Sequence, residues 1–525
     1  MARYRRLIVW FRRDLRVHDH AALAHACQDA DEVIPVFILD PTQLAHDEVG
    51  SGRVQFLLEC LADLDRSLIA RGSYLTLLRG RAEEVLPRFV HCVSAQGVYY
   101  SLDIERWSGQ VRDRALAQRF AREGIVFRGF LNYYLQLEGE YDRERWHAEW
   151  MRFSKQPLYE PPARVPTPEN VSCPSVPSFG YIPTLRDLGL PPSTQRLPLG
   201  GESAARARLQ TFLETRIATY LRCISSPSLA EEDGTSHLSP YLKFGCLSVR
   251  TCVQAARQRY LAAPPAVRRN LQAWASRLQW RDHFIQKFAL YPEAEFVNLY
   301  RPFDALRRYE DADPKLLAAW QEGRTGFPLV DASMRALRET GWLNFRMRAM
   351  LATFLTLNLM IHWRHGAEWF MKHLVDGDTC IDHWQWQMQA GITQPSRPFL
   401  RAYNPLKQCY DHDAEARFIH KYVPELRALP APLVFEPHRL TPLEQSWYGV
   451  HPGRDYPLPI VDAEATRKAA IEALMPIREQ LAQAEREGHL DEYRNRMPGV
   501  TPWLTASKTS EPTNALALGE LEEEA

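Results

Sequence analysis

The segment from residue 376 to residue 386 reads DGDTCIDHWQW, which places three aspartates and two tryptophans directly after a strongly apolar helix. A buried carboxylate is costly unless a cation or a hydrogen-bond donor satisfies it. A tryptophan beside it can pack and can also pass electrons. The segment therefore predicts a cavity in a helical core that holds a polar, redox-active ring. The alternative is an ordinary helix start, because Asp and Thr commonly begin helices.

The sequence around this segment has a helical pattern from about residue 206 onward. Helices are expected over residues 204–220, 271–288, 344–363 and 463–486. Strand-like alternation is scarce, so we predict an all-α domain over residues 206–498. The tail, residues 499–525, is polar and acidic, and we expect it to be disordered.

The first 135 residues instead alternate between strands and helices. Continuous apolar runs at residues 7–11, 32–39, 74–78 and 97–101 are typical of parallel strands that are buried on both faces. Segments with helical character, such as residues 54–71, lie between them. Residues 1–135 therefore predict an α/β domain with a doubly wound parallel sheet. No GxGxxG follows the first strand, so a dinucleotide site is not supported there.

The two predicted domains are joined by residues 136–205. Periodicity stops within this stretch, and proline becomes frequent. We expect a long connection that lies on the surface.

The composition excludes some classes of protein. The 64 basic and 64 acidic residues cancel, so no overall charge marks a nucleic-acid binder, although a local basic face is still allowed. None of the nine cysteines forms a CxxC pair, which argues against a zinc site or a disulfide framework and fits a reducing cytoplasm. The longest apolar run, residues 349–361, is shorter than a membrane span. We expect a cytoplasmic monomer that makes no membrane contact.

The predicted helical domain contains further clusters of polar residues. Residues 234–239, GTSHLS, form a hydroxyl-rich turn before a short helix, which suits a phosphate group; a plain helix cap is the alternative. Residues 278–284, LQWRDHF, combine Trp, Arg and His on one helical stretch, and core packing is the alternative there. Arg348 lies on an otherwise apolar helix and needs a partner, for which Asp376 or Asp378 is the natural candidate.

With these clusters in place, the chain resembles the photolyase/cryptochrome family over nearly its full length. Five motifs occur in the family's order: residues 9–19 (VWFRRDLRVHD), 235–242 (TSHLSPYL), 320–332 (WQEGRTGFPLVDA), 376–386 (DGDTCIDHWQW), and the pair formed by Asn404-Pro405 and residues 418–426. The resemblance implies a U-shaped FAD in the helical domain and a sheet domain able to hold a light-harvesting antenna. The antenna is folate, deazaflavin, flavin or none, because residues 103–107 (DIERW) lack the Asn-Glu pair expected for folate.

The resemblance also implies the residues of the flavin site. Asp376 is expected to pair with Arg348, and Asp382 matches the position that faces flavin N5. The implied FAD contacts are Tyr220, Thr235, Ser236, His237, Leu238, Ser239, Trp274, Arg348, Asp376, Gly377, Asp378 and Asp382. For electron transfer, Trp386 matches the proximal member of a chain and Trp363 the middle member. Tyr309 stands where a third tryptophan is usual, and it can be oxidised if its phenol proton has an acceptor.

The implied contacts with damaged DNA are Arg277, Trp280, Arg281, Phe345 and Gln408. Three positions depart from the pattern of cyclobutane photolyases: Arg277 replaces a Glu, Phe345 replaces an Asn, and Asp382 replaces the Asn common beside N5. An Asp at position 382 resembles plant cryptochromes, where burial would raise its pKa and make it a proton donor.

Two functions follow from the resemblance. The first is a FAD-dependent, blue-light-driven photolyase that repairs cyclobutane pyrimidine dimers by electron transfer from the reduced flavin. The second is a cryptochrome-type photoreceptor, with a signalling partner that the sequence does not identify. The short tail, residues 499–525, offers no large signalling extension and favours repair.

Overall fold

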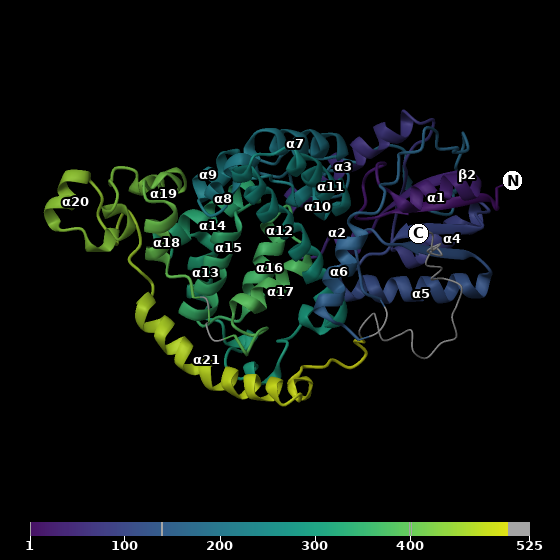
Figure 1. Cartoon of the computed structure of the whole chain (residues 1–525). Helices are drawn as coiled ribbons and strands as arrows, with labels where there is room; N and C mark the ends of the chain where they lie inside the picture. The colour runs from purple at the N-terminus through teal and green to yellow at the C-terminus, as the bar shows by residue number, and fades with distance from the viewer. Residues whose placement is uncertain (1, 138–139, 398–399, 401, 502–525) are drawn as a thin grey trace.

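The computed structural model describes residues 2–137, 140–397, 400 and 402–501. Figure 1 shows a sheet domain at the N-terminal end of the molecule and a larger helical domain beside it. The predicted combination of an α/β domain and a helical domain is confirmed.

The sheet has the strand order β5-β4-β1-β2-β3-β6. Neighbouring strands are parallel, except that β6 runs antiparallel to β3 at one edge. Two strands were not expected from the sequence: β5, whose segment VFRGF is short and interrupted by Arg and Gly, and β6, which comes from the proline-rich connection. The strands are β1 (Tyr4–Phe11), β2 (Ala30–Leu39), β3 (Thr76–Arg79), β4 (Gly97–Ser101), β5 (Val126–Phe130) and β6 (Ser178–Phe179).

Helices cover both faces of this sheet, as its continuous apolar strands require. Leu7, Val9 and Phe11 of β1 share a core with α1 and α3 on one face. Ile8 and Trp10 share a core with α4 and α5 on the other. The helices are α1 (Ala21–Asp29), α2 (Pro41–Leu44), α3 (Ser51–Ile69), α4 (Ala82–Cys92) and α5 (Trp107–Glu123).

The connection between the domains is more structured than the sequence predicts. It contains α6 (Arg143–Phe153), whose Trp146 and Trp150 are buried. It also supplies β6, and Cys173 forms a disulfide with Cys92 at the end of α4. The expectation that the cysteines form no disulfide was therefore wrong: the two residues are 81 positions apart, and only the fold brings them together.

The helical domain begins at α7. Its elements are α7 (Glu202–Glu214), η1 (Arg216–Thr219), α8 (Tyr220–Cys223), α9 (Pro227–Leu229), η2 (Ala230–Gly234), α10 (Ser239–Lys243), α11 (Val249–Leu261), α12 (Pro265–Leu290), η3 (Pro292–Glu295), η4 (Arg301–Phe303), η5 (Tyr309–Asp311), α13 (Pro314–Glu322), α14 (Pro328–Thr340), α15 (Phe345–Thr353), η6 (Phe354–Asn358), α16 (Trp363–His373), α17 (Thr379–Gln389), α18 (Pro405–His412), α19 (Arg417–Tyr422), η7 (Pro424–Leu426), η8 (Leu433–Phe435), η9 (Pro437–Arg439), α20 (Pro442–Tyr448), α21 (Ala463–Arg486) and η10 (Leu490–Tyr493).

The helix expected over residues 344–363 is broken into separate elements. α15 passes into the π-helical turn η6, and Met360 then adopts a positive φ of 53°. Trp363 therefore begins α16 and does not end the preceding helix. This break allows α16 to pack along α17, which carries the segment that opened the sequence analysis.

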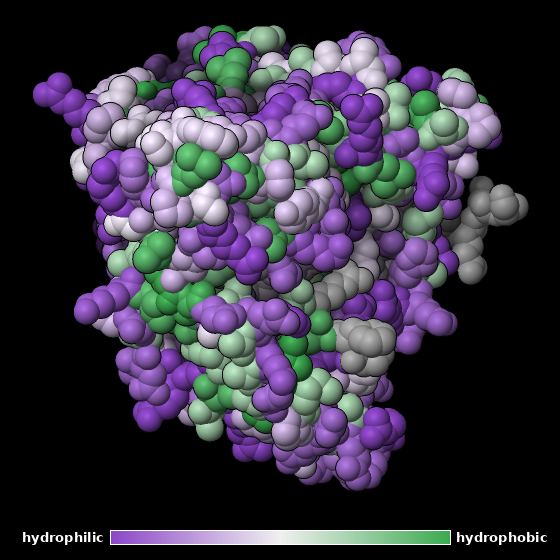
Figure 2. Space-filling model, turned by 90° about the vertical axis from the view of Figure 1, so that its left-hand side faces the viewer, coloured by the Kyte–Doolittle hydropathy of each residue, from purple (hydrophilic) through white to green (hydrophobic). Residues whose placement is uncertain are grey.

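The surface and the termini add little to the site. The face turned toward the viewer in Figure 2 is largely hydrophilic, with hydrophobic side chains in separate patches. Among the residues that the structure describes, no helix has the length and apolar character needed to cross a bilayer. Most of the predicted tail, from residue 502, lies outside the described residues.

Candidate functional site

A cavity of about 290 Å³ lies in the helical domain, between α12, α15, α16, α17 and the turn that precedes α10. Most of the residues that the sequence assigned to the cofactor line it, although they come from five helices (α8, α10, α12, α15 and α17) and the turns before α10 and α17. The lining includes Tyr220, Ser236, Leu238, Ser239, Trp274, Arg348, Asp376, Gly377, Asp378 and Asp382.

Two expected cofactor residues, Thr235 and His237, do not line the cavity. The ring of His237 stacks on Trp342 with centroids 4.1 Å apart, and its Nε2 lies 2.6 Å from the carbonyl of Ala230. Burial lowers the pKa of His237 to about 4, so the ring is neutral. His237 therefore stabilises the turn that begins at Ala230. Thr235 is buried, and its hydroxyl has no hydrogen-bond partner.

Arg348 and Asp376 form the predicted ion pair. Two nearly parallel bonds join them, from Nη1 to Oδ1 at 3.1 Å and from Nη2 to Oδ2 at 2.8 Å. This bidentate geometry fixes both side chains at the cavity wall. Arg348 also donates through Nε to the carbonyl of Leu343, so its guanidinium is held at three points.

Asp378 has a different partner from the one that the sequence suggested. It caps α17 by accepting from the backbone N–H of Cys380, and its Oδ2 lies 2.8 Å from Nη1 of Arg13 in the sheet domain. Burial alone would raise the pKa of Asp378, but Arg13, Lys243 and Arg281 lower it below its ordinary value. Asp378 is therefore an anion that ties the two domains together.

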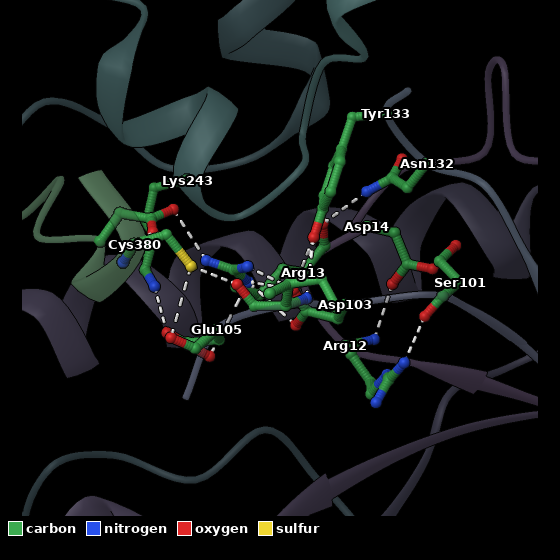
Figure 3. Close-up of polar contacts among 12 residues, drawn as sticks. Arg12, Arg13, Asp14, Ser101, Asp103, Glu105, Asn132, Tyr133, Lys243 and Cys380 are labelled. Atoms are coloured by element: carbon green, nitrogen blue, oxygen red, sulfur yellow. Dashed lines mark hydrogen bonds and ion pairs between the residues drawn. The ribbon is translucent and has the colours of Figure 1, made fainter. Parts of the chain in front are cut away.

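Figure 3 shows the surroundings of Arg13 at this junction. Asp103 follows β4 and accepts from Nε of Arg13 at 2.9 Å. Glu105 lies between Arg13 and Lys243 and pairs with both. The N-terminal motif, residues 9–19, thus supplies Arg13, the cation that joins the sheet domain to Asp378 in the wall of the helical cavity.

Asp382 is the unpaired acid of the site. It lines the cavity, and its Oδ2 is buried without a hydrogen-bond partner. Burial raises the pKa of Asp382 well above its ordinary value, and Arg348 offsets this only in part. Burial therefore favours the protonated form of Asp382, whereas the neighbouring cations favour the ionised form of Asp378, four residues earlier.

Trp386 lines the cavity on the same helix and is almost fully buried. Its ring meets Phe370 and Trp320 edge-on, with centroids 4.9 and 6.0 Å away. A Cβ at Gly366 of α16 would collide with its Cη2 atom, so only glycine allows this close approach. Trp363 lies one turn before Gly366, is buried, and donates through Nε1 to Asn298 at 2.9 Å.

Tyr309 has the proton acceptor that the sequence analysis required. Its hydroxyl donates to Oε2 of Glu368 at 2.8 Å, and its ring stacks on His365 with centroids 4.0 Å apart. Burial and the Glu368 carboxylate raise the pKa of Tyr309 to about 12. Tyr309 is thus a neutral phenol with a base in contact, an arrangement suited to coupled loss of an electron and a proton.

The expected DNA contacts divide into two groups. Arg277, Arg281 and Phe345 line the cavity, and Phe345 is 47% exposed. Trp280 does not line it: the ring packs against His283 and Phe284, with Arg143 above it. Gln408 is buried in α18 and also does not line it.

A second, larger cavity of about 920 Å³ lies between the domains. It is lined by the C-terminal ends of β1 and β2, where open α/β sheets bind ligands. Arg53 is buried in its wall with Nη2 unpaired, and burial and the neighbouring Arg106 lower the pKa of Arg53 to about 10. Tyr309 lines the same cavity. Its other cationic lining residues are Arg12, Arg13, Arg112, Lys243, Arg364 and Lys372.

Comparisons with known proteins agree with this architecture. The family model described as DNA photolyase matches residues 7–139, and the one described as the FAD binding domain of DNA photolyase matches residues 274–475. The deoxyribodipyrimidine photo-lyase of Synechococcus sp. is 32% identical over 498 residues, which cover 92% of this chain and 99% of that protein. The chain belongs to the photolyase/cryptochrome family.

Photolyase/cryptochrome relatives of both kinds are similar to this chain. A cryptochrome DASH of Gloeobacter violaceus is 34% identical over 87% of this chain and 93% of its own length. The solved structure of an archaeal photolyase from Sulfolobus tokodaii, with two FAD molecules, has a TM-score of 0.72 and 28% identity, covering 90% of this chain and 100% of that one. The expected family and FAD cofactor are confirmed.

The residues of the helical cavity fit FAD. Oδ2 of Asp382 and Oε1 of Gln385 are buried without a hydrogen-bond partner. The lining also contains the cations Arg277, Arg281 and Arg348. Buried polar atoms without partners are rare in native proteins, so their presence in one cavity indicates a polar ligand.

Sequence reasoning missed several residues of the site. Trp320, which contacts Trp386, lies in a motif that was quoted only for its resemblance. Arg13, Arg53 and His383 were assigned no role. For His383 a signal existed, because the residue directly follows Asp382 in the sequence.

Proposed function

We propose that this protein is a FAD-dependent photolyase that uses blue light to split cyclobutane pyrimidine dimers in DNA. The observation that carries the proposal is the composition of the cavity mouth. Arg277 and Arg281 supply positive charge there, and the exposed ring of Phe345 supplies an aromatic face. A dimer flipped out of the duplex needs both, because phosphates attract cations and bases stack on aromatic rings.

FAD, when bound, supplies the photoexcited electron for this reaction. The protein's own residues bind and orient the cofactor and the lesion. Arg348 and Asp376 fix the cavity wall, while Trp386, Trp363 and Tyr309 form the path by which an oxidised cofactor is recharged. Each of these side chains is buried or half-buried, which keeps water away from the path.

The test is dimer repair under blue light. Reduced protein is incubated with dimer-containing single-stranded and double-stranded DNA, and the remaining dimers are counted. We expect light-dependent loss of dimers, weakened by Phe345→Ala and Arg277→Ala. The matched control is Arg269→Ala, near the start of α12 and outside the cavity lining. No loss of dimers under saturating light would reject the repair function.

Asp382 favours a second candidate, a cryptochrome-type photoreceptor. A buried acid whose pKa is raised by burial is able to hand over a proton when the cofactor gains charge. Asp382→Asn separates the two functions. In a repair enzyme the variant retains dimer repair, whereas in a receptor it changes the lifetime of the light-induced state.

We also propose that the interdomain cavity binds the second, light-harvesting chromophore. The cations in its lining suit a folate, deazaflavin or flavin with a phosphate or carboxylate group, and the unpaired Nη2 of Arg53 points to an anion. Mass spectrometry of pigments released from purified protein tests this. Arg53→Leu is expected to lose the second pigment and retain FAD.

A further inference from the structure

We propose that His383 is a proton relay that returns protons to Asp382 from the interdomain cavity. The inference rests on the proposed position of Asp382 beside the flavin and adds the route by which that acid is recharged. His383 directly follows Asp382 in α17, is buried, and does not join the lining of the flavin cavity.

The first observation is a pair of buried atoms that face each other. Nδ1 of His383 lies 3.6 Å from Oδ2 of Asp382, just beyond hydrogen-bond range. Both atoms are buried, and neither has a hydrogen-bond partner. Two unpaired polar atoms in contact range are explained if a proton passes between them, since a small side-chain rotation then closes the gap.

The second observation is the set of charges that act on the ring. Besides Asp382 they are Glu48, Arg106 and Arg364. All three line the interdomain cavity, and Glu48 acts on Asp382 as well. The buried ring of His383 thus contacts Asp382 and interacts with charges of the interdomain cavity wall, although it lines neither cavity.

Packing alone does not explain a histidine at this position. The ring meets Trp363 edge-on with centroids 5.6 Å apart, a contact that a phenylalanine would make equally well. Trp363 does not satisfy the ring nitrogens, because its Nε1 donates to Asn298. A residue chosen only to fill space here would not bring a polar atom that is left unpaired.

The protonation states suit a relay. Burial lowers the pKa of His383 to about 3, so the ring is neutral, and burial raises the pKa of the facing Asp382, which favours its protonated form. A neutral imidazole carries one N–H and one acceptor nitrogen. It can therefore give a proton from one side while it takes one from the other.

The step conserves charge and atoms and moves no electrons. After Asp382 has lost its proton, the Nδ1–H bond of His383 breaks and an Oδ2–H bond forms on Asp382. Nε2 of the same ring takes up a solvent proton that arrives through the interdomain cavity. The ring ends neutral with its proton on Nε2, and loss of that proton to solvent together with protonation of Nδ1 restores the first tautomer.

The test is hydrogen–deuterium exchange at the Asp382 carboxyl group, followed by infrared spectroscopy in the dark. The band is assigned as the acid C=O stretch that Asp382→Asn removes. We expect His383→Phe, which keeps the contact with Trp363, to slow exchange roughly 100-fold. Glu48→Gln is expected to slow it less. The control is His25→Phe, a half-buried histidine of the sheet domain that stacks on Phe130.

An unchanged exchange rate in His383→Phe would overturn the relay, as would the absence of any acid band at Asp382. If His383→Phe fails to fold, nitrogen NMR of ¹⁵N-histidine-labelled protein decides. We expect a neutral His383 with its proton on Nδ1, and a ring protonated only on Nε2 contradicts the proposal. Flavin content and dimer repair are measured on the same samples. If flavin content and repair are lost while the exchange rate is normal, the proposed function is rejected. If the exchange rate is not slowed while flavin content and repair are normal, only the relay is rejected.

Discussion

The two cavities of this molecule differ in which buried groups lack a partner. The helical cavity, of about 290 Å³, is lined by both cations and acids, and its unpaired buried atoms are the acceptors Oδ2 of Asp382 and Oε1 of Gln385. The interdomain cavity, of about 920 Å³, is also lined by both charges, but its unpaired buried atoms are guanidinium nitrogens of Arg12, Arg53 and Arg364. This difference supports our proposals that the first cavity surrounds a polar ring and that the second binds an anionic group.

Two aspartates of α17 show how the boundary between the cavities creates this contrast. Asp378 reaches the sheet domain and is ionised by Arg13, whereas Asp382 lies one helical turn further on without a cation in contact. The domain interface, more than the local sequence, thus decides which acid carries charge.

The largest effect is expected from removing Arg348, the cation that pairs with Asp376 in the wall of the helical cavity. Arg348→Met leaves the buried Asp376 without its partner, which costs about 3 kcal/mol of stability because an uncompensated charge remains. Thermal unfolding and the flavin absorbance of purified protein measure the loss, and we expect colourless protein. The control is Arg346→Met, two residues earlier, whose guanidinium donates to Ser225. Full flavin occupancy in Arg348→Met would count against the proposed cavity.

Trp386→Phe is expected to abolish most photoreduction of oxidised flavin, because the first member of the path is removed. Flash absorption spectroscopy follows the reaction. Trp384→Phe serves as the matched control, since Trp384 is buried on the same helix but stacks on Tyr291, away from the cavity lining. Slower photoreduction in the control than in Trp386→Phe would place the path elsewhere.

Asp378→Asn and Asp382→Asn should alter stability with opposite dependence on pH. The depressed pKa of Asp378 means that its charge stabilises the fold above about pH 4, and this contribution is lost as pH falls through the folded pKa. The raised pKa of Asp382 means that native stability declines as pH rises above about 4 toward the folded pKa.

Urea unfolding across a pH series measures both effects. Asp378→Asn should be destabilised at neutral pH and little changed in acid. Asp382→Asn should gain stability relative to the parent as pH rises. Parallel curves for the two variants would remove the electrostatic contrast between these neighbours.

The smallest effect on the fold is expected from the second cavity. Arg53→Leu removes a buried cation that lacks a full set of partners, so stability should change little while the second pigment is lost. Arg66→Leu, on the exposed side of the same helix, is the control. Retention of the pigment by Arg53→Leu would show that Arg53 is not its anion contact.

Sequence reasoning predicted the parts of the site that follow from local chemistry. A cation on an apolar helix implied a nearby acid, and Arg348 does pair with Asp376. Strand and helix periodicity likewise predicted the two domains. The partnership of Asp378 with Arg13 was beyond reach, because 365 residues separate them and Asp378 looked like a helix cap, which it also is.

Two further residues lie outside the cavity lining, so their predicted contacts remain predictions. His237 was assigned to the cofactor by its place in a motif, and a carbonyl of the preceding turn contacts its Nε2. Trp280 was expected at the lesion, and its half-buried ring packs against Phe284 and Arg143. Motif position alone could not give these local contacts.

Gly366 has a consequence for the proposed electron path. Tunnelling rates fall steeply with the gap between donor and acceptor, and here the absence of one methyl group lets α16 approach the ring of Trp386 closely. If electrons pass between Trp386 and Trp363 as proposed, a residue with no side chain sets the distance that they cross.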